Sequence, residues 1–370
     1  MAVSSKTRSV LWARSAGRCQ YCNESLIGDL ISGNEDSNFG FVAHIVAESP
    51  GGPRGDVVRS PLLADDVNNL MLLCYVHHKL IDVDAVSEHP EQLLRDMKAV
   101  HEDRISILTA INQDRAAHVL RYGAKIGSNE SPVAFEHVRL AMLPDWYPAD
   151  GRSIGIEILG SVLEDGEQKF WDTEPDNLRR QFESKVRPLI VEREIRHLTV
   201  FALGPIPLLV ELGQLLCDIV PADVYQLHRE PTAGWKWPAD RPMVEYEFTR
   251  PMQTHGPVAL KLGLSATIND DRITAILGED TAIWSLTAKT QGNDIMRHPD
   301  DLMEFRRFLR NAYNAIKATH GEAAEIHVFP AIPVSAAVET GRVWMPKADL
   351  PLIIYDQNRD RGFVRKLKIA

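Results

Sequence analysis

The sequence predicts two units: a small α+β unit built around a metal site, followed by a larger α/β unit. Three observations lead to this prediction. The chain has 370 residues, and one domain usually has about 100–200. Three of its four cysteines fall in the first fifth of the chain, close to paired histidines. After about residue 133, strand-like segments alternate with helix-like segments, which is typical of parallel sheets covered by helices.

The first unit is expected to span residues 1–121. A short helical segment leads into a Cys-x-x-Cys turn and a polar loop over 28–38. Strand composition follows at 41–46 and 68–74, on either side of a turn-rich loop at 48–56. Apolar residues at helical spacing predict a closing helix over 90–111. The polar, Gly- and Ser-containing stretch 122–134 is the expected linker.

The second unit is expected to span residues 135–370. Its helix over 300–319 has one apolar face and stops at His320-Gly321. The alternation predicts an α/β fold with mainly parallel sheets. The expected strands lie at 154–163, 197–203, 223–228, 243–248, 258–266, 282–287, 325–329 and 350–356.

Two segments of the second unit resemble each other. Each has a strand, an Ile-Pro turn, a helix and a second strand, beginning at Thr199 and at His327. Either any two β-α-β units look alike, or the unit consists of two Rossmann-like halves related by a pseudo-two-fold axis. Ligands of such sheets bind beyond the carboxyl ends of the strands, which here are the two Ile-Pro turns.

This placement selects candidate nucleotide-binding residues. The turn after the first strand precedes a helix, whose backbone N–H groups favour phosphate. The Trp235-Lys236-Trp237 loop offers ring faces for stacking, or else a lid on the core. Cys217 is expected in the core. The candidates are Gly204, Pro205, Pro207, Trp235, Lys236, Trp237, Phe329, Pro330, Pro333 and Tyr355.

Composition and charge narrow the function. Hydrophobic residues make up 44% and charged residues 25% of the chain, which excludes disordered and collagen-like classes. The net charge of −10 excludes a general polycation, so nucleic acid must be met by a local patch or a bound cation. The start lacks a signal-peptide core, and the most apolar stretch contains Pro205, Pro207, Glu211 and Asp218. We expect a soluble, cytoplasmic protein with no membrane partner.

Cys19-x-x-Cys22 and Cys74-x-x-His77 form two paired knuckles. Thiolate and imidazole are the ligands that Zn²⁺ prefers, in a tetrahedral arrangement. Because four protein ligands leave no open position for a substrate, we expect a structural zinc that couples to folding.

The segments VAHIV and NNLMLLCYVHHKLID place His44, Asn69 and His78 in order around this corner. The pattern resembles the HNH nucleases, over about residues 10–85. The resemblance implies a ββα-metal core and metal-dependent hydrolysis of double-stranded DNA. His44 would be the general base, Asn69 would orient it, and His78 would bind Mg²⁺ or a similar divalent cation.

One position departs from that family. Many HNH enzymes carry Asp or His immediately before the catalytic histidine, whereas this chain has Ala43. The second ligand of the catalytic metal therefore stays open. Glu48 and Asp56 are candidates, unless they are ordinary loop charges. Arg54 in the same loop is a candidate for DNA binding through phosphate, or a surface arginine.

From about residue 150, the stretches VFALGPIPLLVELG, GWKWP, VALKLGLSATI, DTAIWSL, IHVFPAIPVSAAVETGRVWMP and LIIYD resemble the SAVED domain, a relative of the CARF ligand-sensing Rossmann folds. Fused to HNH, they resemble the HNH–SAVED effectors of CBASS, a bacterial antiphage system. This implies two fused CARF-like halves, activation by a cyclic di- or trinucleotide, and a homo-oligomer, such as a dimer, that assembles further on activation.

Two other functions stay open. A restriction-type HNH nuclease would use its C-terminal domain to read DNA sequence or modification, which the net charge of −10 disfavours. A non-catalytic zinc module would not need His44, Asn69 and His78 together. The sequence does not define the activating nucleotide, the cleavage preference or the number of subunits.

Overall fold

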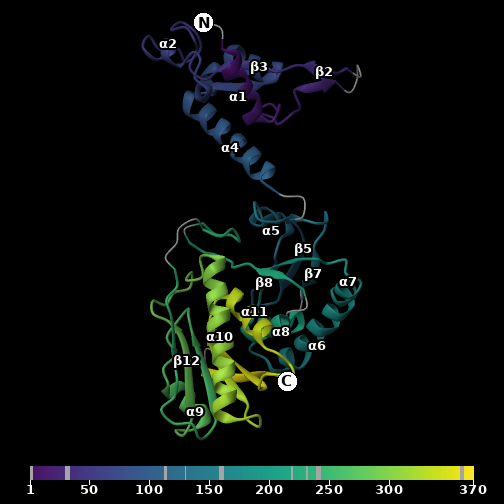
Figure 1. The fold of residues 1–370 in the computed structure, drawn as a ribbon, viewed down its shortest axis with the longest axis vertical. Coiled ribbons are helices and arrows are strands. Elements are labelled where there is room, and N and C mark those ends of the chain that lie inside the picture. Colours follow the sequence, from purple (N-terminus) through teal and green to yellow (C-terminus); the bar gives the residue numbers. More distant parts are fainter. Residues whose placement is uncertain are drawn as a thin grey trace. The chain divides into compact units, whose positions relative to one another are not determined.

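A computed structural model describes residues 3–29, 34–111, 115–129, 131–157, 162–217, 220–230, 232–238, 243–358 and 362–370. The chain divides into two compact units, Met1–Asn112 and Gln113–Ala370 (Figure 1). Among the described residues, no helix is long and apolar enough to cross a membrane.

The boundary between the units differs from the expected linker at 122–134. Residues Ala116–Gly123 form strand β5, which pairs in parallel with β8 of the second unit from His118 to Gly123. This strand buries Leu120 and Tyr122 in the main core of that unit. The second unit therefore begins before β5, and residue 130 of the expected linker lies outside the described residues.

The first unit centres on an antiparallel pair of strands, in which Phe41 lies opposite Leu73 and His44 opposite Leu70. All four residues of the second strand are buried, as expected for an apolar run in a small core. The expected closing helix is α4. The elements are α1 (Ser5–Ser15), β1 (Ile27–Asp29), β2 (Asn34–Asn38), β3 (Phe41–His44), α2 (Arg59–Leu63), β4 (Leu70–Leu73), α3 (Tyr75–Lys79) and α4 (Glu91–Thr109).

The second unit contains two sheets. In the first, all pairs are parallel in the order β6-β5-β8-β9, and β7 also pairs with β5. Its elements are β5, α5 (Phe135–Ala141), β6 (Tyr147–Pro148), β7 (Ile154–Glu157), α6 (Gln168–Lys185), α7 (Arg187–Val191), β8 (Leu198–Leu203), α8 (Ile206–Leu216) and β9 (Ala222–Val224). Residues 158–161 of the strand expected at 154–163 lie outside the described residues.

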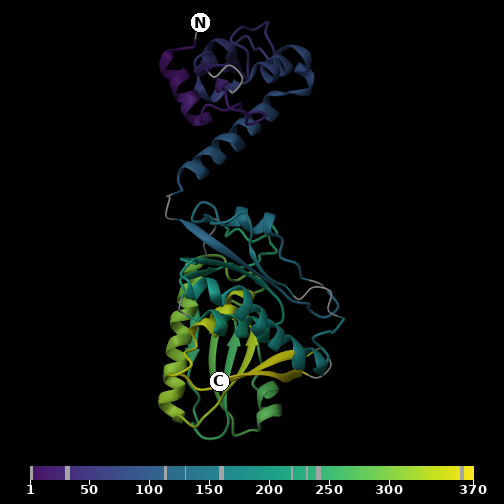
Figure 2. The ribbon, with the colours of Figure 1, turned by 90° about the vertical axis from the view of Figure 1, so that its right-hand side faces the viewer.

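The second sheet has the order β10-β12-β11-β13-β14-β15, with four parallel strands between two antiparallel edges. Figure 2 shows its green and yellow strands side by side. The mainly parallel α/β fold is confirmed. The elements are β10 (Tyr246–Thr249), β11 (Val258–Gly263), α9 (Asp271–Leu277), β12 (Ala282–Ala288), α10 (Pro299–His320), β13 (Ile326–Ala331), α11 (Val334–Val343), β14 (Leu352–Asn358) and β15 (Gly362–Ile369).

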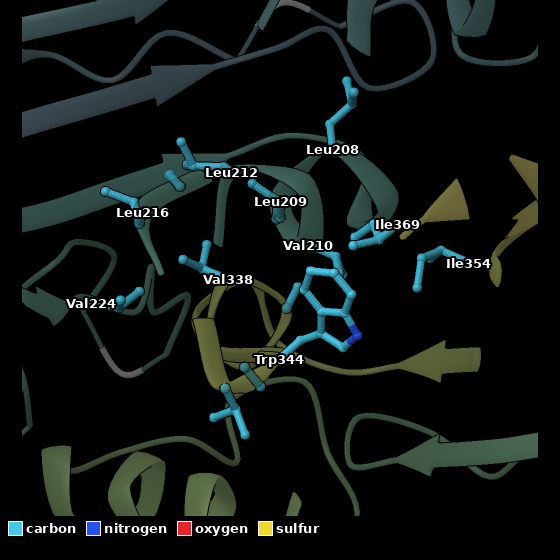
Figure 3. Close-up of a cluster of buried hydrophobic side chains, with 14 of the residues drawn as sticks. Leu208, Leu209, Val210, Leu212, Leu216, Val224, Val338, Trp344, Ile354 and Ile369 are labelled. Carbon is cyan, nitrogen blue, oxygen red and sulfur yellow. The ribbon is translucent and has the colours of Figure 1, made fainter. Parts of the chain in front are cut away.

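The two repeated segments occupy equivalent positions, β8-α8-β9 in one half and β13-α11-β14 in the other. Helices α8 and α11 cross at glycines that are each the eighth residue of their helix. A Cβ on Gly213 would lie 1.9 Å from the carbonyl oxygen of Val338, and one on Gly341 would lie 1.9 Å from that of Val210. Figure 3 shows Val210 and Val338 in the apolar cluster around this crossing. The reciprocal contact supports two related halves.

We expect Gly213→Ala to destabilise the second unit, because the new Cβ forces two backbones apart. Overpacking of this kind costs about 1–3 kcal/mol or more. Urea unfolding followed by near-UV circular dichroism measures the change. Gly166→Ala is the control, since no atom lies within 4 Å of its Cβ position. Equal unfolding midpoints for the two variants would contradict the close crossing.

Candidate metal centre and histidine site

The four predicted metal ligands come together. The ligand atoms of Cys19, Cys22, Cys74 and His77 lie within 4.8 Å of one another, the one such group of His, Cys or acidic donors among the described residues. Cys74 precedes α3, so His77 returns to the same side one turn later, with Nδ1 3.0 Å from Cys74 Sγ and 4.0 Å from Cys19 Sγ. Ligands of tetrahedral zinc stand about 3.3–3.8 Å apart, so these donors need only small shifts to surround an ion.

The surroundings of the cluster also fit a cation. Desolvation raises the pKa of the Cys22 thiol to about 11, with smaller contributions from the nearby Cys19 and Cys74. Three adjacent thiolates therefore need a positive charge between them. The ring of Tyr21 stacks on His77 with centroids 4.1 Å apart, which fixes the imidazole plane.

His44 is the last residue of β3 and is half-buried. Its Nε2 lies 3.0 Å from the carbonyl oxygen of Ala64. A carbonyl only accepts, so Nε2 carries the hydrogen. In the neutral ring, Nδ1 is then the nitrogen with a free lone pair.

Asn69 is fully buried directly before β4. Its Oδ1 accepts from Val46 N at 2.9 Å, and its Nδ2 donates to Val46 O at 2.8 Å and to Leu63 O at 3.2 Å. These bonds hold the chain just after His44 and just before Ala64. The amide therefore fixes both the strand end and the hydrogen-bond partner of the histidine.

His78 lies on α3, and Nε2 is 3.5 Å from Oδ2 of Asp82. The ring of Phe41 is nearly parallel to that of His78, with centroids 5.4 Å apart. We did not expect Asp82 from the sequence. The available signal was its spacing of four residues from His78, which places two side chains on one helical face.

Arg54 does not present its guanidinium to solvent. Its side chain is only 8% exposed. The oxygen atoms that it binds belong to the first unit. Nε donates to Ile45 O at 2.7 Å, Nη1 to Ile81 O at 2.9 Å, and Nη2 to Asp82 Oδ1 at 2.6 Å. Longer contacts of 3.5 Å reach His89 O and His44 O. This arrangement is contrary to the expected phosphate contact.

The two acidic candidates for the second metal ligand lie in the same loop. Asp56 accepts hydrogen bonds from the backbone N–H groups of Val58 and of Arg59, the first residue of α2. These bonds lower the pKa of its carboxyl. Glu48 is exposed. A third carboxylate, that of Asp82, lies next to His78.

Most candidate nucleotide-binding residues are core residues. Trp235 is 6% exposed and meets Phe201 edge-on at 5.4 Å. Phe329 is fully buried and stacks on Tyr355 at 4.3 Å. The residues of the Ile-Pro turns are also buried: Gly204, Pro205, Pro207, Pro330 and Pro333. Lys236 is exposed, and Trp237 lines a cavity of about 550 Å³ with Arg115, Trp146, Tyr225 and Arg306.

Within the described residues, the two Ile-Pro turns also offer few backbone N–H groups to a ligand. Leu208 N and Leu209 N bind Pro205 O, and the prolines lack N–H groups. At α11, the backbone N–H and the hydroxyl of Ser335 both bind Oε1 of Gln226. Cys217, expected in the core, instead ends α8 half-exposed with φ of 42° and lines a cavity of about 670 Å³.

A different cavity lies where α/β sheets usually bind ligands. Its volume is about 510 Å³, and its wall includes Lys289–Gly292, directly after β12. Gln291 donates to Gly263 O at 3.1 Å, so this wall is tied to the end of β11. Arg297 also lines it. This edge was not expected from the sequence, because the candidate residues were chosen largely from the two repeated segments, and β11 and β12 belong to neither.

Residues 178–369, just over half of the chain, match the SAVED family, described as the SMODS-associated and fused to various effectors sensor domain. No curated protein matches the sequence.

The fold is similar to the Acinetobacter baumannii Cap4 SAVED/CARF-domain containing receptor with the cyclic trinucleotide 2'3'3'-cAAA, at 12% identity and TM-score 0.43, covering 75% of this chain and 56% of that one. The same receptor with 3'3'3'-cAAA matches at 11% identity and TM-score 0.43, covering 75% of this chain and 56% of that one. The Moraxella osloensis Cap4 SAVED/CARF-domain containing receptor matches at 8% identity and TM-score 0.37, covering 80% of this chain and 67% of that one. The matched part thus spans little more than half of the first receptors.

We expect Asn69→Ala to loosen the end of β3, because the buried N–H and C=O groups of Val46 lose the amide that binds them. Each such loss costs about 1–3 kcal/mol. Amide hydrogen exchange of residues 41–47, read by mass spectrometry, should become faster. The control is Asn68→Ala at the neighbouring exposed asparagine. Unchanged exchange in Asn69→Ala would show that the amide does not hold this segment.

Proposed function

The chain belongs to the SAVED family of sensor domains, and from this premise we propose that it is a DNA endonuclease activated by a cyclic oligonucleotide in antiphage defence. The observation that carries the nuclease half is the placement of His44 at the end of β3, Asn69 directly before β4 and His78 on α3, beside a four-ligand Cys/His cluster. The sensor half follows from the family.

In the proposed hydrolysis, His44 is the general base. Ala64 O holds Nε2–H, so Nδ1 accepts a proton from the attacking water. The same carbonyl then stabilises the imidazolium, because its oxygen faces the ring. Asn69 keeps both partners in place through Val46 and Leu63.

His78 and Asp82 are the proposed ligands of a divalent cation. Their Nε2 and Oδ2 atoms are 3.5 Å apart, close to the separation of about 3 Å between adjacent ligands of an octahedral Mg²⁺ or Mn²⁺. When bound, such a cation would neutralise charge on the scissile phosphate. Ala43 is buried and supplies no ligand, so Asp82 takes the role that the position before His44 has in many HNH enzymes.

We place the cyclic nucleotide at the carboxyl edge of the second sheet. The cavity beside Lys289–Gly292 supports this, since it combines backbone of a strand end with Lys289 and Arg297. A ligand bound there activates the chain only if it favours one state over another. We propose that the favoured state is a higher assembly of a dimer, which gathers several nuclease units on one duplex.

We expect plasmid DNA and Mg²⁺ to give cleavage only when an activating cyclic di- or trinucleotide is added. His44→Ala and His44→Gln should both cut about 100- to 10,000-fold more slowly, since neither has a base. Glutamine retains an N–H for Ala64 O, so it separates the base from the hydrogen bond. Light scattering on the same samples should show a larger mass with the activator.

Three outcomes would contradict parts of this proposal. Cleavage without any nucleotide would favour a restriction-type nuclease. Full activity of His44→Gln would end the assignment of the base. Activation at constant mass would exclude assembly as the mechanism.

We also propose that Cys19, Cys22, Cys74 and His77 hold one structural zinc. Elemental analysis should find one zinc per chain. Cys74→Ala should lose the zinc and the folded first unit, because this unit has a small core. Cys217→Ala, outside the cluster, should retain both. A folded wild-type protein without zinc would refute the site.

A further inference from the structure

We propose that Arg54 is a positioning residue that sets the geometry between His44 and the cation ligands His78 and Asp82. The inference rests on the proposed nuclease function. It assigns Arg54 a role inside the unit, where its guanidinium holds a protein carboxylate instead of a phosphate.

The contacts of Arg54 join two segments that are distant in sequence. On one side, Nε donates to Ile45 O at 2.7 Å, and Nη2 lies 3.5 Å from His44 O. On the other side, Nη1 donates to Ile81 O at 2.9 Å, and Nη2 donates to Asp82 Oδ1 at 2.6 Å. One nitrogen, Nη2, therefore touches both the residue of the base and the carboxylate of the cation pair.

The hydrogen bond from Arg54 to Oδ1 of Asp82 also orients the second oxygen of that carboxylate. Oδ1 is held by Arg54, and Oδ2 lies 3.5 Å from His78 Nε2. A carboxylate that is 21% exposed would otherwise rotate towards water. Because two segments and one side chain are fixed together, a shift of the π-helical segment Leu80–Asp84 relative to β3 would break several bonds at once.

Lysine cannot replace this arrangement. Its ammonium is a single point with rotatable donors, whereas the planar guanidinium reaches both segments with fixed directions. Arg54→Lys thus keeps the positive charge and removes the geometry. The local charge is unchanged, so a difference between the two proteins reports positioning.

The test measures Mn²⁺ binding to the full chain by titration calorimetry. We expect Arg54→Lys to weaken binding about tenfold or more, and the Mn²⁺ needed for half-maximal plasmid cleavage to rise by the same factor. The control is Arg59→Lys, an exposed arginine paired with Glu91. Zinc content and circular dichroism report whether each variant is folded.

Coupling to Asp82 makes the test specific. If Arg54 acts through that carboxylate, Arg54→Lys should add little to the loss in Asp82→Asn. Asp82→Glu covers the case in which Arg54→Lys does not fold. It keeps the charge but moves the oxygens by one methylene, so it should also bind Mn²⁺ about tenfold more weakly.

Two results would overturn the inference: wild-type affinity in folded Arg54→Lys, or wild-type affinity in Asp82→Glu. Additive losses in the double variant would show that Arg54 does not act through Asp82. A wild-type protein that neither binds Mn²⁺ nor cuts DNA with any activator would instead refute the proposed nuclease function.

Discussion

The requirement that buried polar groups find partners decides how both units are organised. In the first unit, the buried amide of Asn69 and the guanidinium of Arg54 are satisfied by backbone on several segments. In the second, the carboxylate of Glu339 is 2% exposed and accepts from Arg306 and Arg342. Burial raises the pKa of this carboxyl, and the two arginines oppose that shift without cancelling it. Each group therefore joins segments that are distant in the sequence.

Short-range spacing made part of this protein predictable. Each Cys/His knuckle, each of the two strands between the knuckles and each repeated β-α-β segment follows from a local pattern. Strand β5 was not expected, because the boundary was placed at the polar stretch 122–134, which begins inside the strand. In the fold, Arg121 is half-buried and pairs with Glu157 at 2.5 Å, so the charge is neutralised by a partner 36 residues away.

Side-chain roles that depend on distant partners could not be predicted. Arg54 reads as a loop arginine until Asp82 is brought beside it, and Asp82 reads as an ordinary acidic residue until Arg54 holds it. The aromatic candidates failed for a related reason. Trp235 and Phe329 suggest ring faces for stacking, but both side chains are buried against other aromatic rings of the core.

The reciprocal contact of Gly213 and Gly341 has the form of an isologous interface, the kind that joins two identical subunits of a symmetric dimer. Here both partners belong to one chain. In a dimer of identical halves every substitution appears twice, whereas a fused pair can change one side alone. The two sheets differ in this way: the first is parallel throughout, and the second has an antiparallel strand at each edge. Each sheet can therefore carry a surface of its own, and a site on one sheet need have no counterpart on the other.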